Sequence, residues 1–100
     1  MANVFVADTV WEKIQELENY LIDELKLSES AALQRTDRMR WFLKSIMPFQ
    51  HTLCRFKQWR VFGYRCAVFE KSWIFAYEIF DDGVIVRDMS NTALLKDVEW

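Results

Sequence analysis

One stretch of the chain decides the fold: Trp73-Ile74-Phe75-Ala76-Tyr77-Glu78-Ile79-Phe80-Asp81-Asp82-Gly83-Val84-Ile85-Val86-Arg87-Asp88-Met89. Two runs rich in β-branched and aromatic residues, 73–80 and 84–89, flank an Asp-Gly sequence. This sequence is typical of a hairpin turn, because glycine readily takes the positive φ that the turn requires. A similar run, 64–69, precedes them after Gly63. The second half of the chain therefore predicts a three-stranded antiparallel meander.

The first half predicts a short strand followed by a helix. Residues 3–7 are short, apolar and β-branched, as in a strand. Thr9-Val10-Trp11-Glu12 is a capping box, in which the hydroxyl and the carboxylate satisfy amides at a helix start, and it predicts a helix over about 9–27. Apolar residues recur along it at helical spacing: Val10, Ile14, Leu17, Leu21 and Leu25.

A second helix follows with almost no room for a loop. Ser28 offers a fresh N-cap, so this helix is expected to fold back on the first as a helical hairpin. It stops by Pro48, which cannot continue the hydrogen-bond ladder. Its apolar stripe comprises Ala32, Met39, Leu43 and Ile46, and Trp41 lies on the opposite, polar face, either as an anchor for a partner or beneath a crossing loop.

These elements predict a single α+β domain over residues 1–100. The chain is of single-domain length, and 52% of its residues are hydrophobic and 16% aromatic, enough for a core. The order β-α-α-β-β-β places the helical hairpin on one face of a mainly antiparallel four-stranded sheet, because neither layer can bury its apolar side alone. Residues 48–62 read as irregular and basic, and 92–97 as a last short helix.

The cysteines, the single histidine and the hydropathy of the chain limit the kinds of site that it can form. Cys54 and Cys66 are too few for a disulfide framework and are interpreted as buried free thiols, given the strong burial preference of cysteine. With His51 alone, no metal-ligand spacing can be assembled, so neither a metal nor a cofactor is expected. No stretch resembles a leader or a membrane span, which predicts a cytoplasmic protein without a membrane partner.

The net charge of −2 averages over unlike parts of the chain. Residues 31–65 carry eight Lys and Arg against Asp37 alone, whereas 1–30 and 66–100 each carry seven Asp and Glu against two and three basic residues. Such asymmetry marks a binding face, although a solvated helix face produces part of it.

Arginines on the predicted strands are the main candidate site residues. Arg65 and Arg87 alternate with apolar residues, which is costly unless each is paired, for example with Glu78 or Asp88, or forms a surface for phosphates. Trp59 offers a stacking platform for a base, or it is packing. The candidate catalytic residues are Arg60, Arg65 and Arg87, and the candidate binding residues are these three with Lys57, Trp59, Arg38 and Trp41.

Several segments together resemble a known family. They are the β-α-α-β-β-β order, the junction Ser28-Glu29-Ser30-Ala31-Ala32, the strand entry Gly63-Tyr64-Arg65, the strand 73–79, and Val84-Ile85-Val86-Arg87-Asp88 with a closing Leu94-Leu95. Over nearly the whole chain they look like RelE/ParE-type toxins of bacterial type II toxin–antitoxin modules, the plasmid stabilisation type. The resemblance implies a growth inhibitor neutralised by a cognate antitoxin, as a hetero-oligomer with it or as a homodimer.

The resemblance leaves two targets open. In the RelE branch, basic groups cleave messenger RNA on the ribosome, and Lys57, Arg60, Arg65 and Arg87 match their places. The ParE branch poisons DNA gyrase. Where family members often carry a His or a Tyr after the last strand, this chain reads Met89-Ser90-Asn91-Thr92, and its helical hairpin is long. Both features favour a ParE-like action over an mRNA endoribonuclease; a toxin-like protein that only binds is the third hypothesis.

Overall fold

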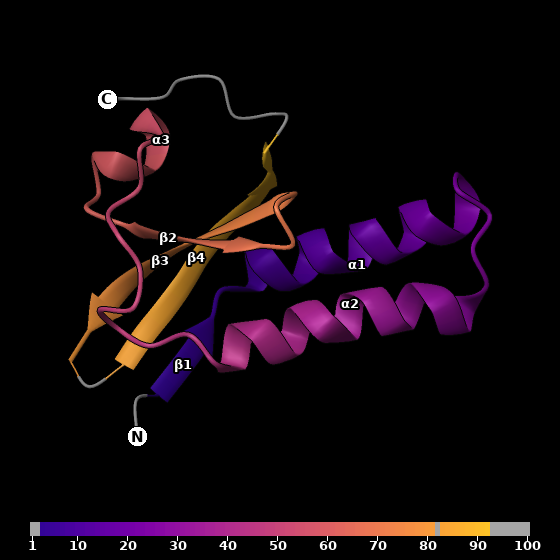
Figure 1. Ribbon diagram of the computed structural model, residues 1–100, viewed down its shortest axis with the longest axis horizontal. Helices are drawn as coiled ribbons and strands as arrows, with labels where there is room; N and C mark the ends of the chain where they lie inside the picture. Colours follow the sequence, from indigo (N-terminus) through magenta and orange to yellow (C-terminus); the bar gives the residue numbers. More distant parts are fainter. Residues whose placement is uncertain (1–2, 82, 93–100) are drawn as a thin grey trace.

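The structure is a computed structural model, and it describes residues 3–81 and 83–92. Along the chain the elements are β1 (Asn3–Val6), α1 (Asp8–Asp23), α2 (Glu29–Lys44), α3 (Lys57–Arg60), β2 (Arg65–Phe69), β3 (Trp73–Phe80) and β4 (Gly83–Asn91). Figure 1 shows the helical hairpin α1–α2 lying along the sheet and extending beyond its end. The fold is two-layer α+β, as predicted; apart from Thr92, the predicted helix at 92–97 lies outside the described residues, and so does the closing Leu94-Leu95.

The sheet has four strands in the order β1-β4-β3-β2. The meander β2–β3–β4 is antiparallel, which confirms the prediction, and β3 has the predicted bounds. The first strand pairs with β4 in parallel, over Asn3↔Gly83 to Val6↔Val86. The sheet is therefore mixed, with the two strands most distant in sequence side by side.

The helical hairpin forms as predicted, but the N-cap predicted for its first helix does not. Ser28 caps α2, since its Oγ accepts a hydrogen bond from the Ala31 N–H at 3.1 Å. The predicted Thr9 capping box is wrong: Ala7 is the N-cap of α1 and caps with no side-chain bond. The reason is that the Ala7 N–H donates to the Val86 carbonyl, which continues the β1–β4 pairing directly into the helix. Both helices also end earlier than predicted, at Asp23 and Lys44.

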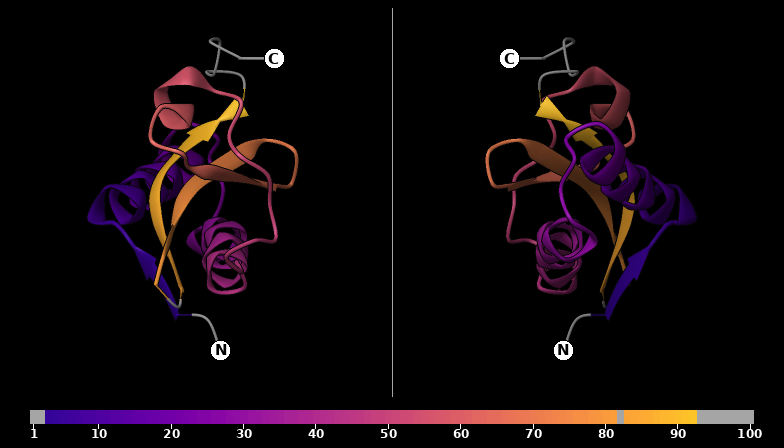
Figure 2. Two further views of the ribbon diagram at one scale, coloured as in Figure 1. Left: turned by 90° about the vertical axis from the view of Figure 1, so that its left-hand side faces the viewer. Right: turned by 90° about the vertical axis from the view of Figure 1, so that its right-hand side faces the viewer.

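The main core lies between the helical hairpin and one face of the sheet. From the predicted apolar stripes of the two helices it takes Val10, Ile14, Met39, Leu43 and Ile46. Ala32 and Leu21 are buried but do not belong to it, and Leu25 is exposed beyond the end of α1. From the sheet it takes Ala67, Phe75, Tyr77, Val84, Val86 and Met89. In Figure 2, where α2 is seen end-on, the curved sheet bends around this helix and α3 lies at the opposite end.

A second, smaller cluster covers part of the other sheet face. It comprises Cys54, Trp59, Ile74 and Ala76, with Phe56, Tyr64 and Cys66 packed against it. The segment read as irregular from the sequence thus contains a one-turn helix, α3, whose Trp59 is buried against β3. This segment returns to the sheet through a bridge between Leu53 and Arg65.

Cys54 and Cys66 form a disulfide, so the prediction of free thiols is wrong. The Cys54 N–H donates to the Tyr64 carbonyl, and the Cys66 N–H donates to the Thr52 carbonyl. This short antiparallel pairing brings the two Cα atoms within 4.9 Å, although the cysteines are 12 positions apart in the sequence. That spacing falls within the reach of a disulfide.

Gly83 has a different role from the one predicted. It is the first residue of β4, and among the described residues of the β3–β4 connection the positive φ is that of Asp81, at 45°. A Cβ on Gly83 would lie 2.1 Å from the backbone oxygen of Asn3. Glycine is therefore needed here for the close approach of β1 and not for turn geometry.

Beyond Val86, β1 has ended and α1 lies beside β4. The Lys13 Nζ donates to the Met89 carbonyl at 3.1 Å and pairs with Asp88 Oδ1 at 2.6 Å. The same Asp88 oxygen accepts the Met89 N–H. Side chains thus satisfy both backbone groups of Met89 that turn away from β3.

A buried carboxylate ties α1 to α2. Glu18 is 6% exposed, and it accepts hydrogen bonds from Thr36 Oγ1 at 2.5 Å and from Arg40 Nη2 at 2.6 Å. Burial raises the pKa of the Glu18 carboxyl, but the hydrogen bonds from Thr36 and Arg40 outweigh it, so the pKa lies below its usual value. The charged form is therefore the one that stabilises the hairpin.

Because the charged form of Glu18 stabilises the fold, we expect the protein to lose stability in acid. A lowered native pKa stabilises the fold above the pKa of the unfolded chain, about 4.3, and the benefit is lost as pH falls through the native value. Glu18→Gln should be less stable than wild type at pH 7, with a difference that narrows toward pH 3. Urea unfolding at both pH values measures this, and a constant difference would contradict it. Glu24→Gln, at an exposed position, is the matched control.

Candidate functional site

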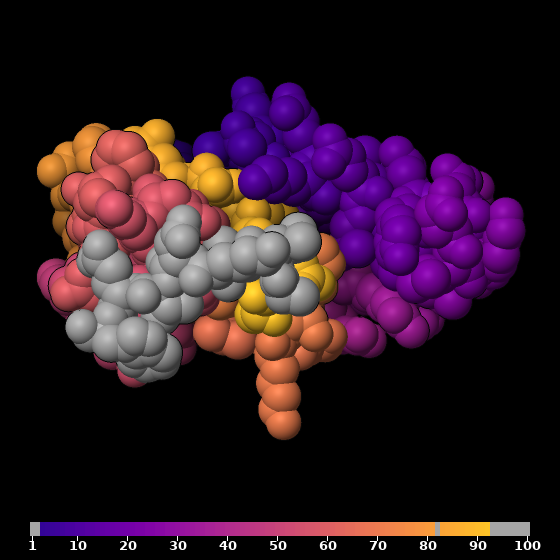
Figure 3. Space-filling model, turned by 90° about the horizontal axis from the view of Figure 1, so that it is seen from above, coloured from indigo at the N-terminus to yellow at the C-terminus, as the bar shows by residue number. Residues whose placement is uncertain are grey.

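Several of the predicted site residues meet around α3. We call this the α3 surface, and it consists of the exposed Lys57, Gln58 and Arg60 of the helix, Phe62 and Tyr64 just after it, and Arg87 of β4. Gln58, Phe62, Tyr64 and Arg87 line one depression of about 380 Å³ together with the start of α1. In Figure 3, α3 and the tip of the helical hairpin lie at opposite ends of the molecule. The surface is therefore remote from the hairpin tip.

The charged side chains of the α3 surface are cations. Arg87 donates through Nε to Glu78 at 2.8 Å and forms an ion pair with the same carboxylate. The neighbouring Asp88 is held by Lys13 and by the indole N–H of Trp59, at 3.2 Å. Both nearby carboxylates are thus engaged, and Lys57 and Arg60 remain exposed at the surface.

The aromatic platform on this surface is not the predicted one. Trp59 is 4% exposed and packs edge-to-face on Phe56, so a base has no open face of this ring on which to stack. Instead, Phe62 stacks on Tyr64 with ring centroids 5.2 Å apart, and Phe62 is 66% exposed. Phe62 was not among the predicted site residues, although it follows the basic segment 55–60 in the sequence.

Arg65 lies away from the α3 surface. It pairs across the sheet with Tyr77 on the face that the hairpin covers, whereas Arg87 and Glu78 lie on the opposite face. Its Nη1 donates to the His51 carbonyl at 2.7 Å, and its guanidinium lies over the ring of Phe49. The predicted common surface of Arg65 and Arg87 is therefore wrong.

Arg38 and Trp41 are on α2, far from α3. Trp41 is 72% exposed on the polar side of the helix, with Lys44 Nζ 5.2 Å from its ring centroid. No crossing loop within the described ranges buries it, which removes that alternative. Arg38 pairs with Glu70 of the β2–β3 turn at 3.0 Å.

His51 and Tyr77 form a polar contact beneath residues 47–51. The Tyr77 hydroxyl lies 3.2 Å from His51 Nδ1 and 3.3 Å from the carbonyl oxygens of Met47 and Pro48. Burial lowers the pKa of the His51 imidazole and raises that of the Tyr77 hydroxyl, so both are neutral at pH 7. Tyr77 is fully buried, and this contact anchors the segment that follows α2.

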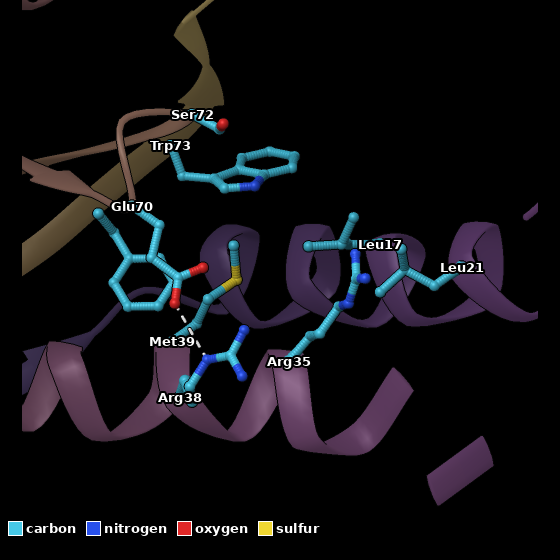
Figure 4. Close-up of a pocket in the computed structure, with 9 residues that line it drawn as sticks. Leu17, Leu21, Arg35, Arg38, Met39, Glu70, Ser72 and Trp73 are labelled. Carbon is cyan, nitrogen blue, oxygen red and sulfur yellow. Dashed lines mark hydrogen bonds and ion pairs between the residues drawn. The ribbon is translucent and has the colours of Figure 1, made fainter. Parts of the chain in front are cut away.

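A second candidate surface is a groove of about 390 Å³ between the helical hairpin and the β2–β3 turn. Figure 4 shows Leu17 and Leu21 of α1 on one side, and Trp73 over the gap. The guanidinium of Arg35 reaches from α2 toward these leucines, whereas Arg38 turns to Glu70. The groove therefore combines apolar side chains with Arg35 and with the Arg38–Glu70 ion pair.

Within the described ranges, no cluster of three metal-ligating side chains is present. In the same part of the chain, no helix is both long and apolar enough to cross a membrane. The sequence matches no protein-family model and no curated protein.

Proposed function

We propose that this protein is a cytoplasmic toxin of a type II toxin–antitoxin module, resembling the RelE/ParE superfamily, that inhibits growth by a ParE-like action on DNA gyrase. The observed two-layer fold, with a helical hairpin on one face of a mixed sheet, supports the proposal because it agrees with the architecture that the resemblance implies. The α3 surface is the part we assign to the target.

One observation carries the choice of a binding action over RNA cleavage. Arg65 and Arg87, which cleavage would use together, lie on opposite sheet faces and are each engaged, one by a backbone carbonyl and the other by Glu78. The carboxylates beside Arg87 are engaged as well. A general base must reach the proton that it abstracts, and these contacts leave the nearby groups poorly placed for that role.

The groove in Figure 4 supports the expected antitoxin partner. An amphipathic helix can bury its apolar side on the half-buried Leu17 and Trp73, in the manner of helix-in-groove recognition. A carboxylate beside that apolar side would meet Arg35. An acidic amphipathic antitoxin segment is therefore the partner that we assign to this surface.

The first test is expression of the protein alone in a bacterial host. Growth should stop, and co-expression of the product of the adjacent gene should restore it. Purified protein should also inhibit supercoiling by gyrase. Harmless expression of folded protein that still binds the adjacent product would instead support the hypothesis of a binding protein without toxicity.

Charge reversal on α3 should abolish the arrest. Lys57→Glu with Arg60→Glu removes the exposed cations of the helix, and surviving colonies after induction should rise at least tenfold. Lys26→Glu with Lys44→Glu makes the same change of charge away from α3 and should leave the arrest intact. Equal loss of arrest in both double variants would exclude a specific role for α3, provided that circular dichroism shows both to be folded.

The second candidate function is a ribosome-dependent mRNA endoribonuclease. The stack of the exposed Phe62 on the half-buried Tyr64 beside Arg87 favours it, because stacked aromatics and cations suit single-stranded RNA. Primer extension on translated messages separates the two functions. New 5′ ends that disappear in Arg87→Ala would establish cleavage, whereas unchanged transcripts during growth arrest would exclude it.

A further inference from the structure

We propose that the Cys54–Cys66 disulfide is a redox modification site, at which a dithiol reductant opens the bond and loosens α3 from the sheet. The bond closes a loop that contains the whole of α3, including Lys57 and Arg60. Its regulatory meaning rests on the function proposed above, because the loop carries the surface assigned to the target. The covalent chemistry stands independently of that function.

The position of the bond gives it control over α3. Cys54 belongs to the cluster that covers one sheet face, and Cys66 lies on β2 at its margin. Besides the disulfide, backbone hydrogen bonds of Cys54 with Tyr64 and of Cys66 with Thr52 hold the ends of the loop together. The buried Trp59 holds α3 on the sheet, and its indole donates to Asp88 at 3.2 Å. Within the loop, Arg60 Nη1 donates to the Cys54 carbonyl at 3.4 Å. The disulfide is therefore a covalent cross-link between the start of this loop and β2, in which the loop ends.

The reaction is a thiol–disulfide exchange. Cys54 is fully buried and Cys66 is half-buried, so a thiolate of the reductant attacks the Cys66 sulfur and Cys54 leaves as a thiolate, which takes up a proton. The second thiol of the reductant then attacks its own sulfur in the mixed disulfide and releases Cys66. Two electrons pass to the protein, which gains two thiols, and the dithiol becomes a disulfide.

Compartment and charge both favour such an exchange. Disulfides in a cytoplasm kept reduced by thioredoxin and glutathione are usually transient or redox-sensing. Cys54 lies in the most basic part of the chain and Cys66 directly follows that part, and cations raise the local concentration of an anionic thiolate. Loss of a cross-link over a loop of this length should favour the open loop by roughly a hundredfold.

Limited trypsin digestion of the full-length protein tests the proposal directly. Arg55, Lys57 and Arg60 provide cleavage sites within the loop, and Lys26, between α1 and α2, provides an internal control. After dithiothreitol treatment, cleavage within the loop should accelerate at least tenfold, while cleavage after Lys26 stays unchanged. The Cys54→Ser, Cys66→Ser double variant should be cleaved rapidly with or without the reductant.

Three results would overturn the proposal. The first is equal loop cleavage in the oxidised and reduced protein. The second is acceleration at Lys26 with loss of the far-ultraviolet circular dichroism signal, since reduction would then unfold the whole chain. The third is alkylation of both cysteines in air-oxidised native protein. If trypsin gives the expected cleavage pattern but the protein does not arrest growth, the proposed function is rejected and the redox site stands.

Discussion

Replacement of Phe75 by alanine should lower the free energy of unfolding by about 3 to 5 kcal/mol, the usual cost of deleting a large buried aromatic side chain. Phe75 is 0% exposed at the centre of β3, between Ala67 of β2 and Met89 of β4. Its ring lies tilted against Phe42 of α2, with centroids 5.9 Å apart. The cavity would therefore open where the hairpin meets the sheet.

The measurement is urea unfolding followed by circular dichroism. Phe80→Ala removes the same atoms at the exposed end of the same strand, and it should change the free energy by less than about 1 kcal/mol. Similar losses in both variants would mean that the helical hairpin does not pack on this face of the sheet, and the assignment of the main core would fail.

Gly83→Ala should destabilise the fold by about 1 to 3 kcal/mol or more, the range found for overpacking. The new Cβ would lie 2.1 Å from the backbone oxygen of Asn3, so β1 has to move away from β4. Because Val4 and Val6 pack against the main core, that movement also uncovers apolar surface. Hydrogen exchange should show faster exchange at Ala7, whose N–H donates to the Val86 carbonyl.

The second glycine supplies the control. Gly63 has a φ of 73°, and a Cβ there meets no atom within 4 Å. Asparagine tolerates this left-handed conformation, so Gly63→Asn should cost less than about 1 kcal/mol. If Gly83→Ala were as mild as Gly63→Asn, the parallel contact of β1 with β4 would have to be abandoned.

The sequence predicts those parts of the fold that local patterns determine. The bounds of β3 follow from an apolar run between two turn sequences, and Ser28 caps α2 because a cap needs only the next three residues. The apolar stripes of the two helices also predict which side packs on the sheet. These features depend on neighbours along the chain, which is why the sequence alone reveals them.

Features that depend on distant partners were not predictable in this way. The position of β1 beside β4 depends on contacts more than 75 residues apart along the chain. The N-cap of α1 is Ala7 and not the predicted Thr9, because the Ala7 N–H bonds to the Val86 carbonyl, a contact that no local motif encodes. The disulfide was missed for a related reason, since the pairing of residues 52–54 with 64–66 involves no regular hairpin turn.

The candidate site was predictable only in part. The basic character of residues 55–60 and the position of Arg87 point to the α3 surface, and in the structure Arg87 lines one depression with Gln58 and Trp59 of α3. Arg65 was grouped with Arg87 because both alternate with apolar residues. Alternation, however, does not reveal which face of the sheet each strand turns outward, and an irregularity in register near Ala76 and Tyr77 complicates it further.

The contact of Lys13 with the edge of β4 has a consequence for the solubility of the protein. An unpaired strand edge is a template on which another chain can add a strand, and repeated addition leads to polymers. The backbone groups of Met89 cannot pair with another strand, because Lys13 donates to the carbonyl and Asp88 accepts the N–H. A lysine and an aspartate therefore protect this edge against strand-to-strand aggregation.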